Sequence, residues 1–216
     1  SWFTMSVVGN VFVLTRACVH HSTTPGMNGV VVSYIANPAK AGRMEAEVDF
    51  YAAAEAEVAA IPNPLINIVL QGRHDTYPKR RGQTRVPEML QYGITVGFGQ
   101  DCVMDPWYSL GTGDMLDVAF MGLHVARMTS PADMRKCYQM VTETSARIMG
   151  LDDYGLAVGR KANLVVLDAS DPIEAIRLRA GRRAVVAKGK LIAEGPSRAY
   201  TLHLPGRPDS VSRRKK

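Results

Sequence analysis

The greater part of the chain alternates short apolar runs, typical of β-strands, with longer stretches of helical periodicity. This alternation predicts βα units built around a parallel sheet. The clearest unit combines a helix over residues 84–92 with a strand over residues 94–98. Residues 58–61 form another apolar run, which stops at Pro62 and Pro64 because two prolines disfavour both a helix and a continuing strand.

Two longer helices are expected next. Residues 114–128 are apolar on nearly every face, so this helix should be buried on more than one side, with His124 as a hydrogen-bonded core histidine. A second helix is expected over residues 131–149. Ser130 is a typical N-cap, a proline occupies the first helical position, and Gly150 marks the end.

The pattern then changes to that of a small β-rich appendage. A strand is expected over residues 163–168, and Asp171 should cap a short helix with Glu174 in its capping box. Two further strands are expected over residues 184–187 and 190–193, joined by a tight turn.

The two ends of the chain follow neither pattern. Residues 7–18 and 29–35 are β-prone runs without the rhythm of βα units. The last twenty or so residues contain three prolines and a basic end, which predicts an irregular strap over the surface.

Length and composition allow a sizeable core, because the chain has 216 residues of which 46% are hydrophobic. The formal net charge is +6, but the final Arg-Arg-Lys-Lys supplies four of those units. We therefore expect no nucleic-acid partner. No apolar run reaches membrane-spanning length, so no membrane partner is expected either.

The three cysteines, Cys18, Cys102 and Cys137, are widely spaced and form no Cys-x-x-Cys pair. This spacing argues against a disulfide framework or a structural zinc site, and it favours a reducing compartment. The apolar residues 6–19 lack the flanks of a signal peptide. The expected location is the cytoplasm.

Candidate chemistry gathers where the strand over residues 94–98 ends. The segment 96–109 reads VGFGQDCVMDPWYS, so an apolar run changes abruptly into a polar cluster. A rigid strand that ends in an acidic loop is how an α/β fold presents a reactive side chain, which makes Asp101 the leading candidate. Another apolar, strand-like run is followed by Gln71, Arg73 and His74, which are candidates for the same rim unless that segment is a solvated or subunit-packing turn.

Several stretches carry a resemblance to a known family. They read NPLINIVLQGRHDTYPKRRG, FGQDCVMDPWY, LGTGDML, MGLHV, TSAR and YGLAVGRKANLVVL, and they begin at residues 63, 98, 110, 121, 144 and 154. In this order they resemble the bacterial cytosine deaminases of the amidohydrolase superfamily, over roughly residues 55–195.

The resemblance implies a metal-dependent (β/α)₈ barrel that hydrolyses cytosine to uracil and ammonia. In that family, zinc or iron is held by a His-x-His pair on the first strand, a His on a middle strand and an Asp after the last strand. Asp101 matches this Asp, so it would bind the metal and relay a proton from the attacking water. Trp107 would wall the pyrimidine pocket, and Cys102 would face the substrate. Gln71, at the mouth by its place after the apolar run, would be a further substrate-binding residue.

The sequence also departs from the family pattern. None of the five histidines belongs to a His-x-His pair, Gln100 stands where the family usually has His, and the family's general-base Glu has no counterpart. A complete barrel needs about 250 residues. We therefore expect an α/β fold comprising a partial (β/α)₈ TIM-type barrel, its C-terminal βα units, and a small β-sandwich appendage.

Four parts are expected along the chain. They are an N-terminal segment of unclear relationship (1–52), the C-terminal part of the barrel (53–150), a β-sandwich return segment (151–195) and an irregular basic tail (196–216). An incomplete barrel exposes a strand edge and an apolar face, so association into a homo-oligomer is expected.

Three functions remain open. The first is metal-dependent deamination of cytosine or a related aminated pyrimidine, and the second is hydrolysis of another cyclic amide or aminated heterocycle. The third is a non-catalytic remnant or interaction module, in which Asp101 only caps a turn, Trp107 packs on the rim and Cys102 is a small buried hydrophobe. The zinc deaminases that use His-x-Glu with Pro-Cys-x-x-Cys are excluded, because both motifs are absent.

Overall fold

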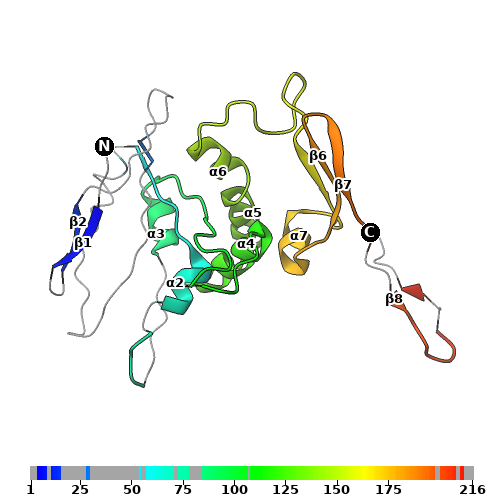
Figure 1. The fold of residues 1–216 in the computed structure, drawn as a ribbon, viewed down its shortest axis with the longest axis horizontal. Coiled ribbons are helices and arrows are strands. Elements are labelled where there is room, and N and C mark those ends of the chain that lie inside the picture. Colours follow the sequence, from blue (N-terminus) through cyan, green and yellow to red (C-terminus); the bar gives the residue numbers. More distant parts are fainter. Residues whose placement is uncertain are drawn as a thin grey trace. The chain divides into compact units, whose positions relative to one another are not determined.

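The computed structural model describes residues 4–8, 11–15, 28–29, 54, 57–70, 73–77, 84–106, 108–197, 200–207 and 210–211, with the backbone alone in the strand residues 4–8, 11–15, 28–29, 58 and 210–211 (Figure 1). The chain forms two compact units, residues 1–152 and residues 153–216. Within the described residues, no helix is both long and apolar enough to cross a membrane.

The first unit contains short parallel strand pairs, as βα units require. Strand β3 (Asn28–Gly29) pairs in parallel with β4 (Val58–Ala59), and Ala60 forms a parallel bridge with Val96. Around this bridge, Ala60 N–H donates to the Thr95 carbonyl at 2.9 Å and Gly97 N–H donates to the Ala60 carbonyl at 3.0 Å. The predicted strand over residues 94–98 is therefore an extended segment paired in parallel with the end of β4.

Helix α2 (Pro64–Leu70) corrects two expectations about the segment after β4. Pro64 does not prevent a helix, because a proline at the first helical position lacks only an N–H that would have no intrahelical partner. The apolar run that follows is helical and not strand-like, and its residues from Pro64 to Asn67 are buried.

Helices α3 (Val86–Gln91) and α4 (Met115–Val125) form where the sequence predicts them. Gly93 follows α3 with a φ of +79°, a backbone conformation that favours glycine. Asp114 caps α4 by accepting from Leu116 N–H at 2.8 Å. Helix α4 packs against both α2 and α5 (Pro131–Met140) (Figure 1). Its Val118 and Ala119 are fully buried.

His124 is hydrogen-bonded as expected, but it is exposed rather than part of the core. Its Nδ1 lies 2.6 Å from the carbonyl oxygen of Phe120 in the preceding turn of α4. The expectation of a core histidine is wrong. Because α4 has apolar residues on several faces, the sequence pattern did not indicate that position 124 faces solvent.

The helix expected over residues 131–149 is divided into α5 and α6 (Glu143–Ile148). Ser130 caps α5 as predicted, since its hydroxyl accepts from Asp133 N–H. The break follows Met140, whose carbonyl oxygen accepts from Phe98 N–H at 2.9 Å and from the Ser145 hydroxyl. The bond from Phe98 joins the extended segment that carries the candidate site to the end of α5.

At the N-terminus, β1 (Thr4–Val8) and β2 (Val11–Thr15) form an antiparallel pair in which Val8 lies opposite Val11. The β-prone run expected over residues 7–18 thus contributes to two strands. Most of the other β-prone run, residues 29–35, lies outside the described residues.

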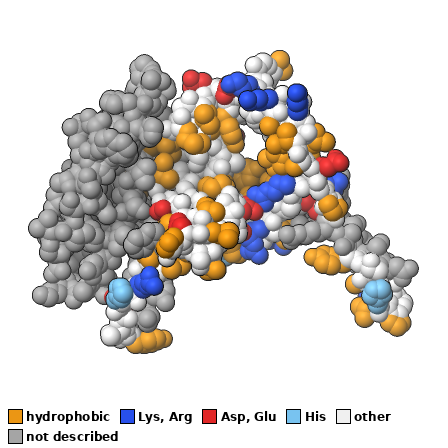
Figure 2. Space-filling model, in the orientation of Figure 1, with side chains coloured by type: hydrophobic (Ala, Val, Ile, Leu, Met, Phe, Trp, Pro, Cys, Tyr) orange, Lys and Arg blue, Asp and Glu red, His pale blue; other side chains and the backbone are white. Residues whose placement is uncertain are grey.

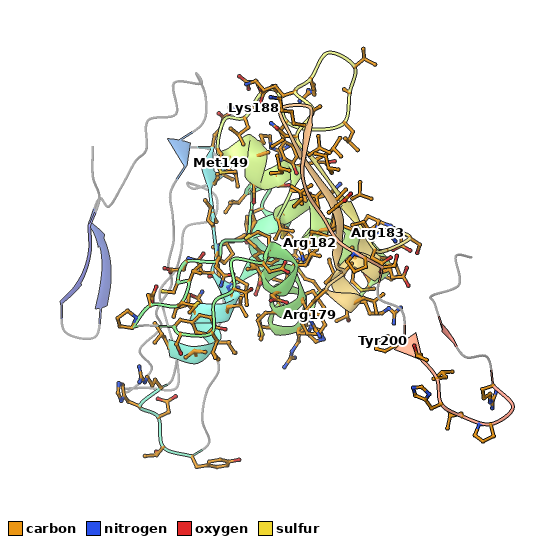
Figure 3. All side chains as sticks on the ribbon, turned by 45° about the vertical axis from the view of Figure 1, so that its right-hand side comes forward. Met149, Arg179, Arg182, Arg183, Lys188 and Tyr200 are labelled. Carbon is orange, nitrogen blue, oxygen red and sulfur yellow. The ribbon has the colours of Figure 1, made fainter. Side chains whose placement is uncertain are left out.

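The second unit contains a three-stranded antiparallel sheet, in the order β5 (Leu164–Leu167), β6 (Arg182–Ala187) and β7 (Lys190–Glu194). Arg182 and Arg183 lie on β6 and Lys188 lies in the turn to β7 (Figure 3). Lys188 and Gly189 have φ values of +49° and +76°, which suit a tight hairpin turn.

Helix α7 (Pro172–Leu178) is capped as the sequence predicts, because Asp171 Oδ1 accepts from the backbone N–H groups of Ile173 and Glu174. The C-terminal strap is more regular than expected, since β8 (Tyr200–Thr201) pairs with β9 (Ser210–Val211). The strands of this unit form one three-stranded sheet and one two-stranded pair among its described residues, so the β-sandwich stays a prediction.

Candidate functional site

The site is built at the rim where two parallel segments end. Gly99 N–H donates to the Pro62 carbonyl at 3.0 Å, so the chain after β4 and the chain leading to Asp101 lie side by side. Asp101 is exposed and has a φ of +64°, in the left-handed region that few residues other than glycine adopt. Such backbone conformations occur often at functional sites.

Both carboxylate oxygens of Asp101 accept hydrogen bonds. The side-chain amide of Asn63 donates from Nδ2 to Oδ2 at 3.3 Å. The thiol of the neighbouring Cys102 donates to Oδ1 at 3.4 Å. The carboxylate is therefore held between a donor from another segment of the chain and a donor from its own loop.

Cys102 is buried, with 7% of its surface exposed. Burial, together with hydrogen bonds to Asp105 and Asp101 and the charges of these two carboxylates, raises the pKa of the Cys102 thiol to about 12. The group is consequently a neutral thiol at physiological pH, and it acts as a hydrogen-bond donor. It lacks the thiolate character of a nucleophile.

The neighbours of Asp101 have structural roles in the loop. Gln100 is buried, and its Nε2 donates to the Cys102 carbonyl at 3.3 Å, while its Oε1 has no hydrogen-bond partner among the residues that are described. Asp105 accepts from Tyr108 N–H at 3.0 Å, which is the turn-forming role that its position before Pro106 predicts.

Two of the predicted substrate-binding residues, Gln71 and Trp107, lie outside the described residues. His74, near Gln71 in the sequence, is exposed. Of the predicted site, the structure thus brings together Asp101 and Cys102, and it adds Asn63.

The described part of the chain does not supply a complete set of ligands for a divalent cation. No three His, Cys, Asp or Glu side chains there are grouped so that they could hold a metal ion. An open catalytic zinc site generally needs three protein ligands. Asp101 offers one carboxylate, and its two oxygens already accept from Asn63 and Cys102.

Asn63 was missed by sequence reasoning because it lies between two prolines, a context that predicts a turn. The available signal was its place at the end of an apolar run, next to the strand that leads to Asp101. Side chains at the carboxyl ends of neighbouring parallel strands meet at one rim.

The chain is similar to several known proteins. The model of the Amidohydrolase family matches residues 31–193. N-isopropylammelide isopropyl amidohydrolase from Pseudomonas sp. strain ADP is 34% identical over 110 residues, which are 50% of this chain and 27% of that protein. Pterin deaminase from Rhizobium rhizogenes is 32% identical over 141 residues, which are 64% of this chain and 32% of that protein.

Among solved structures, 5-methylcytosine deaminase from Klebsiella pneumoniae liganded with 5-fluorocytosine is 41% identical, with a TM-score of 0.67, over 73% of this chain and 38% of that one. An adenosine deaminase from Xanthomonas campestris with bound zinc shares the fold at 19% identity and a TM-score of 0.53, over 68% of this chain and 35% of that one. This chain thus spans about a third or less of the curated relatives described above. The matches imply a TIM-barrel-type α/β fold, as the sequence predicted.

Proposed function

Because the chain belongs to the amidohydrolase family, we propose that it takes part in hydrolytic deamination of an aminated heterocycle, with cytosine or a related pyrimidine as the substrate. The observation that carries the proposal is Asp101, an exposed carboxylate fixed at the rim by Asn63 and Cys102. The 41% identity to 5-methylcytosine deaminase supports the choice of a pyrimidine.

Hydrolytic deamination needs a group that moves protons. Water adds to the ring carbon that bears the amino group, and the amine leaves as ammonia. A carboxylate can accept a proton from the water and return it to the leaving nitrogen. Asp101 is accessible to a substrate, and the hydrogen bonds to Oδ1 and Oδ2 define the direction in which it presents its lone pairs.

Zinc or iron is the proposed cofactor of the whole site, with Asp101 as one ligand. The described residues do not complete a cation site, so the other ligands would have to come from outside them. Cys102, Trp107 and Gln71 are proposed to contact the substrate. The Cys102 thiol is neutral and its proton is donated to Asp101, so it would present an uncharged sulfur to the substrate.

A second candidate is hydrolysis of a different aminated heterocycle. The matches to N-isopropylammelide isopropyl amidohydrolase and to pterin deaminase favour it, since the names of both enzymes refer to rings other than cytosine. Gln100 and Cys102, which differ from the cytosine deaminase pattern, lie next to Asp101 and could alter the choice of ring.

The decisive test is a graft. Residues 55–195 would replace the matching part of the Klebsiella 5-methylcytosine deaminase, and turnover of cytosine, 5-methylcytosine, N-isopropylammelide and pterin would be followed by ultraviolet absorbance. We expect pyrimidine turnover that falls about a hundredfold or more in Asp101→Asn. The matched control Asp153→Asn, which loses a surface ion pair with Lys161, should retain it.

A folded graft that binds metal, measured by elemental analysis, but turns over none of these rings would refute the proposal. Turnover of N-isopropylammelide or pterin alone would favour the second candidate. Full turnover in the Asp101→Asn graft would show that Asp101 is not a catalytic residue.

A further inference from the structure

Asn63 occupies a defined position at the start of α2. Its carbonyl oxygen accepts from Asn67 N–H at 3.0 Å, so the residue forms the first hydrogen bond of the helix. Its side chain is almost fully buried, with 5% of the residue exposed. From this position Nδ2 reaches Oδ2 of Asp101, 38 residues later in the sequence.

Gly99 makes room for this side chain. A Cβ atom at position 99 would lie 2.2 Å from Oδ1 of Asn63 and 3.0 Å from Cγ2 of Ile61. Real Cβ atoms do not approach other atoms this closely, so any larger residue at position 99 would displace the Asn63 amide. The backbone of the segment that carries Asp101 thus packs directly on the group that bonds to its carboxylate.

The two donors to Asp101 differ in what they can fix. Cys102 is the next residue in the same loop, so its bond to Oδ1 moves with that loop. Asn63 belongs to a different segment, which is joined to β4 and α2, and its bond to Oδ2 therefore fixes the carboxylate relative to the sheet. An amide also stays neutral at all physiological pH values, so it adds no competing charge.

We propose that Asn63 is a positioning residue for Asp101, holding Oδ2 from the end of the neighbouring strand while Gly99 keeps the space that this contact needs. The proposal rests on the proposed function in so far as Asp101 is the catalytic carboxylate. Partners of this kind, which orient a functional carboxylate, typically contribute ten- to hundredfold to activity or metal affinity.

The first test needs no substrate. In the full chain labelled with ¹³C-aspartate, the side-chain carboxyl resonance of Asp101 is identified by its loss in Asp101→Asn. We expect Asn63→Ala and Gly99→Ala to shift this resonance in the same direction. Two matched controls should leave it in place: Asn67→Ala, which removes another buried asparagine of the same helix region, and Gly181→Ala, where a Cβ meets nothing within 4 Å.

A reciprocal measurement covers the case in which Asn63→Ala fails to fold. In the Asp101→Asn variant Asn63 itself is intact, and the loss of the charged acceptor should shift its side-chain amide resonances, while those of Asn67 stay unchanged. An Asp101 carboxyl resonance that is the same in wild type and Asn63→Ala, or unmoved Asn63 amide resonances in Asp101→Asn, would overturn the proposal.

The second test uses the grafted deaminase. Asn63→Ala should lower kcat by about tenfold to a hundredfold with a smaller effect on KM, because the substrate still reaches the site. Asn63→Asp keeps the shape of the side chain but removes the donor, so it should lose as much kcat as Asn63→Ala. Wild-type kcat in Asn63→Asp would mean that the side chain only fills space. A folded, metal-binding graft without turnover would refute the proposed function, whereas the resonance shifts would still decide the role of Asn63.

Discussion

The Cys102 thiol donates a hydrogen bond to Oδ1 of Asp101 across 3.4 Å. Burial and the carboxylates of Asp105 and Asp101 raise the pKa of this thiol from 9.0 to about 12. The cysteine that follows the candidate catalytic carboxylate is therefore a neutral hydrogen-bond donor to it.

Cys102 should be a slow nucleophile in the folded chain. At pH 8, a pKa of about 12 in place of 9.0 lowers the thiolate fraction roughly a thousandfold. We expect iodoacetamide to label Cys102 correspondingly more slowly in the native chain than in guanidinium, as measured by mass spectrometry of the peptide that contains it. Equal rates in the two conditions would show that the thiol is neither buried nor bonded to the carboxylates.

We expect the chain to lose stability in alkaline solution because of Cys137. It is fully buried in α5, and burial, together with the charge of Asp133, raises its pKa from 9.0 to about 12. Between pH 9 and 12 the unfolded chain loses this proton while the folded chain retains it, so the free energy of unfolding falls as pH rises through this window.

Urea unfolding at several pH values tests this prediction. Replacing Cys137→Ala should lower stability at neutral pH, because it leaves a cavity, but it should make the alkaline decline shallower by up to about 1.4 kcal/mol per pH unit. Cys102 contributes in the same direction, so some decline should remain. An unchanged slope in Cys137→Ala would contradict the assignment.

Gly122 and Phe98 form a tight contact between α4 and the segment that leads to Asp101. A Cβ at position 122 would lie 2.6 Å from the Phe98 ring, which is itself 2% exposed. Gly122→Ala should therefore destabilise the first unit by about 1–3 kcal/mol. In thermal unfolding, adding Phe98→Leu should recover part of the loss, and additive effects of the two substitutions would argue against the contact.

The 216-residue chain alone is expected to deaminate cytosine little or not at all. The reason is that its sequence has no His-x-His pair and its described residues form no metal site. Turnover would be measured by ultraviolet absorbance with zinc or iron added. Robust deamination under these conditions would mean that ligands beyond the described residues complete the site.

We expect copies of this chain to associate through strand β7. It is an edge strand whose five residues are all exposed, including Leu191 and Ile192 at 57% and 64% exposure. Figure 2 shows exposed apolar side chains lying among Lys and Arg side chains. Exposed apolar edges pair with other chains, and a lysine in the middle of the apolar stretch would oppose pairing more than Lys190 does at the start of the strand.

We therefore expect dynamic light scattering to report association that decreases in Ile192→Lys. Leu156→Lys is the control, because Leu156 is also exposed but lies in no strand. A monomer at all concentrations, or the same decrease in both variants, would contradict the prediction.

Elements fixed by local chemistry were predictable from the sequence. Ser130 and Asp171 cap their helices with the bonds that their residue types favour, and Gly93 adopts the positive φ that ends α3. The turn at Lys188 and Gly189 belongs to the same class. In each case the deciding interaction spans only a few residues.

Features decided by distant partners were not predictable in this way. At the break between α5 and α6, the Met140 carbonyl accepts from Phe98 N–H, which lies more than forty residues earlier in the sequence. The exposure of His124 depends on what packs against α4. Asp101 was identified from the strand that precedes it, but its bond with Asn63 requires two segments to be paired in space.

The carbonyl of Met140 affects whether another strand can pair with the extended segment that contains Val96 and Phe98. The N–H groups of Gly97 and Gly99 point to the chain after β4, whereas the N–H of Phe98 points the other way and is taken by the end of α5. Another strand cannot accept a hydrogen bond from Phe98 N–H unless the bond between Phe98 and the Met140 carbonyl breaks first. The helix end thus blocks lateral addition at the margin nearest the reactive loop, a protection that β7 lacks at its own outer margin within the described fold.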